Sequence, residues 1–192
     1  MYTSDLTRAA HTAQAVAKAL GEPSVAVEEL KELREMHLGV LQGFTAAEAR
    51  QTHQQVWNRY RSDPLFVLPG GESTAGFTSR CAEAFERIAR SHPNETVVVV
   101  THGGVIDAFR RVWAPQDDRF MHCGNTGLCE LVFDHGCQEF RVELWNCLRH
   151  LDFAGDTSDV SSNAVSAPAT SARSVPVSLS RLRADRGADD VV

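Results

Sequence analysis

The stretch Thr96–Thr101, which reads Thr-Val-Val-Val-Val-Thr, constrains the fold more than any other part of the sequence. Its β-branched residues run without polar alternation, which is typical of a strand buried on both faces of a parallel sheet. His102-Gly103-Gly104 follows at once and leads into a segment with apolar residues at helical spacing. A strand, a tight glycine turn and a helix in succession indicate a layered α/β fold.

The flanking sequence predicts further strands and helices of the same kind. Helical patterns are expected in four places: 6–20 behind Ser4 or Asp5 as N-cap, 45–60 behind a Thr45/Glu48 capping box, 73–91, and the segment after Gly104. Strands are expected at 25–27, 96–101, 127–133 and 139–145, the last two joined by a turn at 134–136. We therefore expect a three-layer α/β/α domain over residues 1–151, with a mixed, mostly parallel sheet.

The composition changes abruptly near Asp152. Residues 152–192 are rich in Ser, Ala, Asp and Arg and contain no Trp, Tyr, Cys or Met and one Phe, Phe153. A segment that buries so little apolar surface does not offset its ordering entropy. We expect residues 152–192 to be a disordered tail.

Charge and cysteine content exclude several classes of protein. A net charge of -6 and a pI near 5.7 argue against nucleic acid as a partner. The sequence has no apolar run of the roughly 20 residues that a membrane span needs, and residues 1–20 lack a signal-peptide core. Five cysteines without a C-x-x-C pair favour a reducing, cytoplasmic location over a disulfide framework. The spacing of His122, Cys123, Cys129 and Cys137 matches no structural zinc site.

Three residues are candidates for a site at the carboxyl ends of the strands. Arg8 lies in the first turn of a helix, where a cation opposes the helix dipole unless an anion binds between them. His102 ends the valine-rich strand, and the amide of Gly103 follows it. Glu35 lies in a loop behind a short strand. Taken singly, each has a plain alternative: a solvated Arg, a hydrogen-bonded structural His and a surface carboxylate.

Five motifs occur in an order that resembles the histidine phosphatase superfamily, the phosphoglycerate-mutase-like proteins. They are Tyr2-Thr-Ser-Asp-Leu-x-Arg8-Ala-x-x-Thr12-Ala13, Leu33-Arg-Glu35, Gly39-x-x-x-Gly43, Pro69-Gly-Gly-Glu-Ser73 and Thr101-His-Gly-Gly104. Asn146-x-x-x-His150-Leu151 fits the family's usual end. The resemblance covers Met1 to about Leu151.

This resemblance implies a role for each candidate residue. In the family, a His in an Arg-His-Gly motif attacks phosphorus and forms a phosphohistidine. Arg8 then corresponds to a phosphate-binding Arg, His102 to the second pocket His, Glu35 to the proton donor and Asn125 to a polar residue at the pocket edge. The Gly103 amide is expected to help bind phosphate. For this chain, the resemblance implies that neither a metal nor a cofactor is needed.

The chain departs from the family in one respect: Arg-His-Gly does not occur in it. Met1 falls where the family's second strand is already under way, so the resemblance implies that the first strand is lacking and that a gap lies beside Thr96–Thr101. Leu148-Arg149-His150 is not followed by Gly. We expect no phosphohistidine and negligible phosphatase activity from these 192 residues alone.

Three functions fit this resemblance. The first is a phosphomonoesterase for a small phosphorylated metabolite, because the segment between Gly43 and Pro69 is too short for a large lid. The second is an inactive phosphate-binding or regulatory protein of the same fold. The third is a phosphoglycerate mutase, although mutases of this family carry Glu-Arg-His-Tyr-Gly where this chain has Glu35-Met-His-Leu-Gly39.

Overall fold

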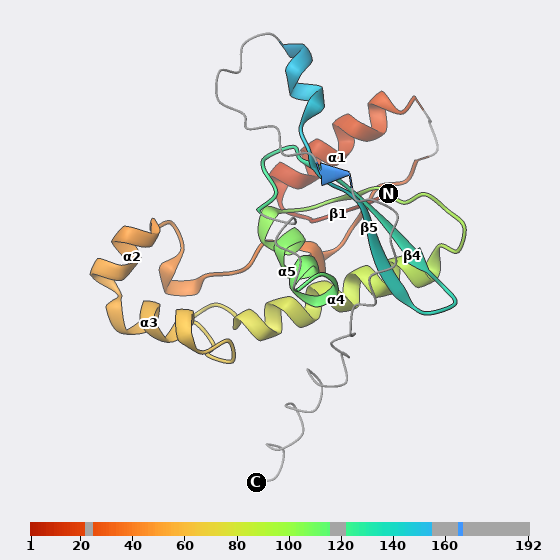
Figure 1. Cartoon of the computed structure of the whole chain (residues 1–192). Helices are drawn as coiled ribbons and strands as arrows, with labels where there is room; N and C mark the ends of the chain where they lie inside the picture. Colours follow the sequence, from red (N-terminus) through yellow and green to blue (C-terminus); the bar gives the residue numbers. More distant parts are fainter. Residues whose placement is uncertain (22–24, 116–121, 155–164, 167–192) are drawn as a thin grey trace.

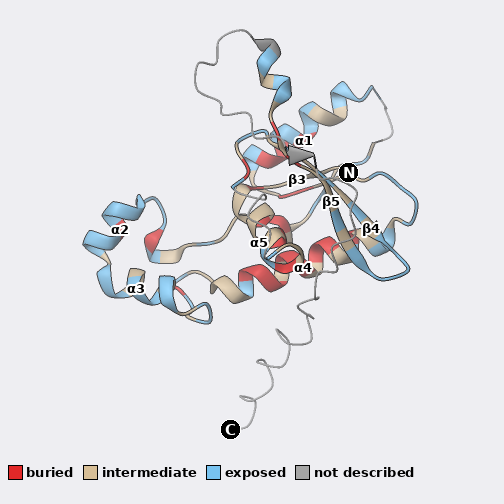
Figure 2. Cartoon of the chain, in the orientation of Figure 1, coloured by how far each residue is buried: buried red, intermediate tan, exposed pale blue. Residues whose placement is uncertain are grey.

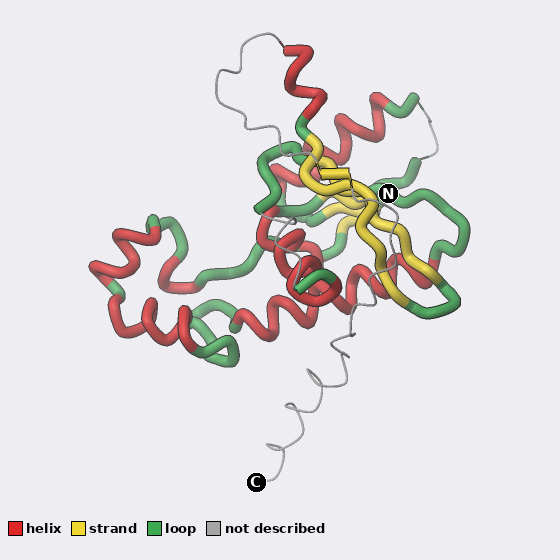
Figure 3. Tube along the Cα trace, in the orientation of Figure 1, coloured by secondary structure: helices red, strands yellow, loops and turns green. Residues whose placement is uncertain are grey.

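The strands of the computed structural model form two three-stranded sheets, one parallel and one antiparallel (Figures 1 and 3). The model describes residues 1–21, 25–115, 122–154 and 165–166. The parallel sheet has the order β2-β1-β3, from β1 (Tyr2–Thr3), β2 (Glu28–Glu29) and β3 (Val99–Val100). The antiparallel sheet has the order β4-β5-β6, from β4 (Leu128–Asp134), β5 (Glu139–Cys147) and β6 (Val165–Ser166). The fold is therefore mixed α/β.

Helices cover the parallel sheet from two sides (Figure 1). The α-helices are α1 (Thr7–Ala19), α2 (Ala46–Thr52), α3 (Gln54–Ser62), α4 (Thr74–Ser91) and α5 (Gly103–Trp113). Short 3-10 helices are η1 (Lys31–Leu33), η2 (Gly39–Leu41) and η3 (Arg149–Ala154). The small side chains of Ala9, Ala10 and Ala13 let α1 approach the strands closely, while α4 and α5 pack on the opposite side.

The main hydrophobic core lies between α4, α5 and the strands, where Figure 2 shows the buried residues concentrated. Phe109 contacts Phe85 and Phe140 edge to face, and Trp113 packs against all three rings. Because Phe140 belongs to β5, these rings attach the antiparallel sheet to the two helices. Fully burying a ring of this size contributes about 1.5–3 kcal/mol.

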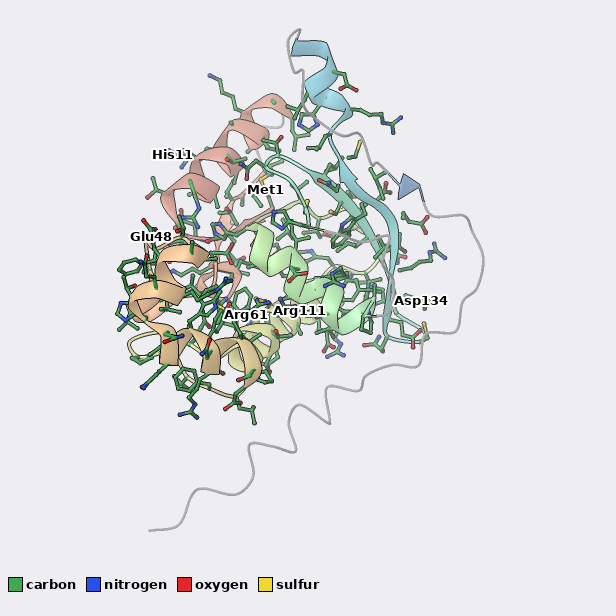
Figure 4. All side chains as sticks on the ribbon, turned by 60° about the vertical axis from the view of Figure 1, so that its left-hand side comes forward. Met1, His11, Glu48, Arg61, Arg111 and Asp134 are labelled. Carbon is green, nitrogen blue, oxygen red and sulfur yellow. The ribbon has the colours of Figure 1, made fainter. Side chains whose placement is uncertain are left out.

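A second, smaller core holds α2 and α3. Leu41, Ala49 and Leu68 are its buried members. The exposed side chains of both helices project outward, as Figure 4 shows around Glu48 on α2 and Arg61 on α3. This unit is therefore attached to the rest of the protein through few buried contacts.

The helical predictions are confirmed with two differences. The Thr45/Glu48 capping box and the Ser73 N-cap are both present. The helix expected over 45–60 is broken at His53 (φ −127°, ψ 42°), which gives α2 and α3. Ser4 and Asp5 do not cap α1, whose N-cap is Leu6. The Ser4 hydroxyl instead accepts the Leu6 N–H at 3.3 Å, which forms a turn just before the helix.

The strand predictions need correction in extent and burial. The expected strand at 25–27 lies at Glu28–Glu29, and only Val99–Val100 of 96–101 forms a strand. The valines of this stretch are half-buried instead of fully buried, because in the described part of the chain β3 pairs on one side only, with β1. The sheet was expected to be single, but the hairpin of β4 and β5 forms its own.

The expected tail falls mostly outside the described residues. Two parts of 152–192 are described: the end of η3, up to Ala154, and β6. The latter pairs with β5 through Leu144↔Ser166 and Trp145↔Val165. At these positions the chain has regular structure where disorder was expected.

Candidate functional site

His102 lies where the carboxyl ends of β1 and β3 meet. It is the N-cap residue of α5 and is buried, and its Nε2 lies 2.8 Å from Oγ of Ser4, which follows β1 and is fully buried. Parallel pairing of Thr3 with Val100 brings these two strand ends together. The carboxyl edge of the sheet therefore carries a His–Ser pair beside the N-terminus of a helix.

Glu35 reaches the same helix N-terminus from the loop after η1. Its Oε2 accepts the N–H of Gly104 at 3.1 Å, and its Oε1 accepts the N–H of Met36 at 2.8 Å. A Cβ added to Gly104 would lie 2.1 Å from Glu35 Oε1. The second glycine of the motif is therefore required for the carboxylate to approach the helix.

Arg8 lies in the first turn of α1 and is exposed. In the part of the chain that the structure describes, its guanidinium makes no hydrogen bond or ion pair, so its donors are free for a ligand. Its charge nevertheless reaches the site, because it helps to lower the pKa of His102. Glu35 and His102 thus meet at the N-terminus of α5, and Arg8 lies close enough for its charge to act on His102.

His102 has a pKa below its ordinary value of 6.5. Burial is the main cause, since it disfavours the charged imidazolium. The positive charges of Arg8 and Arg80 act in the same direction, while Glu35 opposes them. Without a bound anion, His102 is therefore a neutral hydrogen-bonding group at neutral pH.

Arg80 of α4 holds the loop that carries Glu35. Its Nη1 donates to the carbonyl oxygens of Glu32 (2.8 Å) and Arg34 (2.9 Å), and its Nη2 donates to that of Glu35 (3.4 Å). The same guanidinium pairs with both carboxylate oxygens of Glu72, at 2.9 and 2.7 Å. A planar guanidinium suits this two-pronged pairing.

Glu72 extends this network to the loop after Glu35. Its Oε1 accepts the N–H of His37 at 2.8 Å, and its own N–H donates to the His37 carbonyl at 3.1 Å. Burial opposes ionisation, but Arg80 and the His37 N–H hold the pKa of Glu72 below its usual value. A Cβ added to Gly39 would lie 2.1 Å from the carbonyl oxygen of Pro69, and one added to Gly71 would lie 2.4 Å from the carbonyl oxygen of His37. These two motif glycines therefore let the two loops pack backbone to backbone.

The turn that carries Asn125 lies beside Gly103. A Cβ on Gly103 would lie 3.3 Å from His122 Cε1 and 3.8 Å from the Cys123 carbonyl oxygen. Asn146 Oδ1 accepts the N–H of Gly124 at 2.9 Å and so helps to hold the turn. Asn125 itself is exposed. The structure therefore places the turn at the edge of the site, and it records no contact of the Asn125 side chain with the described residues there.

Several residues of this arrangement were missed by the sequence analysis. Ser4 was expected to cap a helix and instead pairs with His102. Asp5 and Arg34 form a two-pronged ion pair with both distances at 2.6 Å, which joins the start of α1 to the Glu35 loop. Asp5 and Arg34 are themselves part of two of the motifs, which is a usable signal, whereas nothing in the sequence points to Arg80.

Comparison with known proteins identifies the family to which this site belongs. A sequence profile of the histidine phosphatase superfamily (branch 1) matches residues 1–148. The chain belongs to the histidine phosphatase superfamily. Its fold is also that of solved family members, with a TM-score of 0.61 and 27% identity to the mycobacterial glucosyl-3-phosphoglycerate phosphatase complexed with inorganic phosphate, over 77% of this chain and 76% of that one.

Among the relatives of this chain are two proteins of Arabidopsis thaliana. The metal-independent phosphoserine phosphatase is 39% identical over 159 residues, which are 81% of this chain and 64% of that protein. Phosphoglycerate mutase-like protein 4 is 34% identical over 157 residues, 81% of this chain and 67% of that protein. The chain thus spans about two thirds of the length of these curated relatives.

Metal ligands do not cluster in the described part of this site. Within the described ranges, His, Cys, Asp and Glu side chains form no group of three or more that could hold a metal ion. Nor does any described helix have the length and apolar character to cross a bilayer. What converges at the sheet edge is a guanidinium, an imidazole, a carboxylate and a helix N-terminus, a set suited to an oxyanion.

Proposed function

We propose that this chain carries the phosphate pocket of a phosphomonoesterase that acts on a small phosphorylated metabolite. The observation that supports it is the meeting of Glu35 and His102 at the N-terminus of α5, with the charge of Arg8 acting on His102. A phosphoryl group placed there receives charge from the unpaired guanidinium of Arg8 and hydrogen bonds from the α5 amides. A bound dianion also favours protonation of His102, which reverses the effect of Arg8 on its pKa.

Glu35 is the proposed proton donor to the leaving oxygen. Its two oxygens each accept one backbone N–H, so each still has a lone pair that these two bonds do not use. A carboxylic acid in this place protonates an alkoxide as the bond to phosphorus breaks. Because the loop of Glu35 is held by Arg80, the acid is kept in position before substrate binds.

Hydrolysis through a phosphohistidine also needs a nucleophile, and the proposal assigns it to an Arg-His-Gly segment that these 192 residues do not include. The described residues leave β3 paired on one side only, with the antiparallel sheet as a separate unit. The chain alone is therefore expected to bind phosphate without turning it over. A binding protein of the same fold is the second candidate, favoured by the same lack of an Arg-His-Gly motif.

Two relatives support a phosphatase over a mutase: the metal-independent phosphoserine phosphatase and the glucosyl-3-phosphoglycerate phosphatase. Both names describe release of phosphate from a small organic ester. The two short helices α2 and α3 are the only described elements between Gly43 and Pro69, which leaves room for a small substrate. Phosphoserine is accordingly the first substrate to test.

The test begins with phosphate binding by the 192-residue chain. Inorganic phosphate should raise the melting temperature, since a ligand that binds only the folded state stabilises it. Arg8→Ala and His102→Ala should each abolish this shift, whereas Arg50→Ala, which removes an exposed cation of α2, should keep it. A shift that survives Arg8→Ala and His102→Ala would contradict the proposed pocket.

Turnover distinguishes the enzyme from the binding protein. In a protein that includes an upstream Arg-His-Gly segment, Arg8→Ala and His102→Ala should each slow phosphate release by about 10²–10³-fold. Glu35→Gln should slow hydrolysis of phosphoserine far more than that of p-nitrophenyl phosphate, whose leaving group needs little protonation. An acid-labile phosphoenzyme on the 192-residue chain would refute the assignment of the nucleophile to another segment.

A further inference from the structure

Two cysteines lie at the ends of the turn that borders the site. Cys123 and Cys129 are separated by five residues, and their sulfur atoms lie 3.9 Å apart. Cys123 is buried and Cys129, in β4, is half-buried. The carbonyl of Cys123 faces Gly103, so this sulfur pair lies directly behind the edge of the proposed phosphate pocket.

The two sulfur atoms have unlike surroundings. Cys129 Sγ accepts the backbone N–H of Asn146 at 3.5 Å and lies within hydrogen-bond distance of Cys123 Sγ, where either sulfur can be the donor. Cys123 Sγ also faces the carbonyl oxygens of Gly124 (3.8 Å) and Gly127 (3.7 Å), which are acceptors for an S–H. Donors around one sulfur favour its thiolate, and acceptors around the other favour its thiol.

The pKa values follow this asymmetry. The hydrogen bond from Cys123, with a further bond from the Asn146 N–H, lowers the pKa of Cys129 below its ordinary value of 9.0, although burial opposes the shift. The same pairing, together with burial, raises the pKa of Cys123. Cys129 is therefore the sulfur that reacts first.

A disulfide between these residues requires a small movement. A sulfur–sulfur bond is about 2.05 Å long, so the two atoms must approach by about 1.9 Å from their present 3.9 Å. Rotation about the Cα–Cβ bonds, with a shift of the turn between them, supplies such a movement. A Cβ on Gly127 would lie 2.6 Å from Cys123 Sγ, so the lack of a side chain there leaves the space that Cys123 occupies.

We propose that Cys123 and Cys129 form a reversible disulfide by exchange with a small disulfide such as oxidised glutathione. The Cys129 thiolate attacks one glutathione sulfur and forms a mixed disulfide, and the first glutathione leaves as a thiolate that takes up a proton. Cys123 then loses its proton to solvent and attacks Cys129 Sγ, which expels the second glutathione. Two protein thiols are oxidised, and one glutathione disulfide is reduced to two thiols.

Closing this ring changes the edge of the site. The turn between the cysteines carries Asn125 and is held by Asn146 and by the contact of His150 Nε2 with Thr126 Oγ1 at 3.1 Å. Drawing the two ends together displaces the Cys123 carbonyl beside Gly103, and we expect phosphate to bind more weakly to the oxidised form. This consequence rests on the proposed function, whereas the disulfide does not.

The experiment exposes the reduced 192-residue protein to oxidised glutathione, blocks remaining thiols and maps the peptides by mass spectrometry. Titratable thiols should fall from five to three, with one cross-linked pair that joins Cys123 to Cys129. In Cys123→Ser the reaction should stop at a mixed disulfide on Cys129. In Cys129→Ser, Cys123 should stay reduced, and Cys137→Ser, which removes an exposed cysteine of the hairpin turn, should leave the cross-link intact.

The proposal would be overturned if Cys123 and Cys129 both stayed reduced under conditions that modify Cys137. A cross-link from either of them to Cys147, or between two protein molecules, would also overturn it. Circular dichroism shows whether each variant is folded. Phosphate-induced thermal shifts of the oxidised and reduced proteins then separate the two claims. If the disulfide forms but phosphate raises the melting temperature equally in both forms, only the effect of the disulfide on the site is refuted. If phosphate raises the melting temperature of neither form, the phosphate pocket is refuted while the disulfide stands.

Discussion

Gly104 shows how one missing side chain organises this site. The two glycines after His102 were interpreted as giving a ligand access to the backbone. At Gly104 the group that makes this close approach is Glu35 of the chain itself, whose Oε1 would lie 2.1 Å from a Cβ. The glycine motif and the acidic residue, which are 69 positions apart, thus form one structural unit.

Burial of His102 has a consequence for stability that depends on pH. Because its folded pKa lies below the ordinary 6.5, the unfolded chain binds a proton first as the pH falls. The stability that comes from burying neutral His102 is therefore complete above about pH 6.5 and is lost as the pH falls through the folded pKa.

This pH effect is measurable by urea unfolding in phosphate-free buffer. Between about pH 7.5 and about pH 5.5, the unfolding free energy of the wild type should fall more than that of His102→Gln. The amide of the variant can still bond to Ser4 but does not titrate. Parallel loss in the two proteins would show that His102 is not the group responsible.

At the scale of elements, α4 fixes the position of the Glu35 loop through a single side chain. Arg80 donates to three carbonyl oxygens of the Glu35 loop and to both carboxylate oxygens of Glu72. Helical periodicity identifies α4 well, because apolar spacing and the Ser73 cap are local features. It does not reveal Arg80, whose partners come from loops that lie far away in the sequence.

Arg80→Lys should therefore destabilise the protein although the charge is kept. A lysine ammonium cannot reproduce the fork to Glu72 and also reach the carbonyls, so we expect a loss of about 2–3 kcal/mol in the free energy of unfolding. Arg87→Lys is the matched control, since Arg87 lies on the same helix and makes a surface pair with Glu32. Its effect should stay within about 0.5 kcal/mol. Equal losses in both variants, measured by urea denaturation, would contradict the role of Arg80.

At the scale of the whole molecule, the two cores differ in size. The main core joins α4, α5 and both sheets through aromatic contacts. The unit of α2 and α3 rests on Leu41, Ala49 and Leu68, and α3 contributes no buried residue. Figure 2 shows this unit as largely exposed. Local opening should begin there, because few buried contacts oppose it.

Hydrogen exchange tests this difference directly. Backbone amides of α2 and α3 should exchange well before those of α4 and α5 in native conditions. Leu68→Ala should speed exchange in α2 and α3 while α5 stays protected, since Leu68 is a fully buried member of the small core. Uniform acceleration across all four helices would mean that the two cores open as one unit.

Local order along the chain was determined by the sequence itself. The capping box at Thr45, the cap at Ser73 and the alternating hairpin of β4 and β5 all depend on neighbouring residues, and each is present. The motif order also indicated the family. The break at His53 and the half-burial of the valine-rich stretch were not predicted, because both depend on what packs against those segments.

Tertiary structure alone decided what meets at the site. The bond between Ser4 and His102, the approach of Glu35 to Gly104 and the bonds of Arg80 to the Glu35 loop join residues from 45 to 98 positions apart. Such contacts depend on which strands pair and how loops cross, and no short-range pattern encodes them. Periodicity and capping arise from local sterics and hydrogen bonding, whereas a site arises from the long-range packing that brings strand ends together.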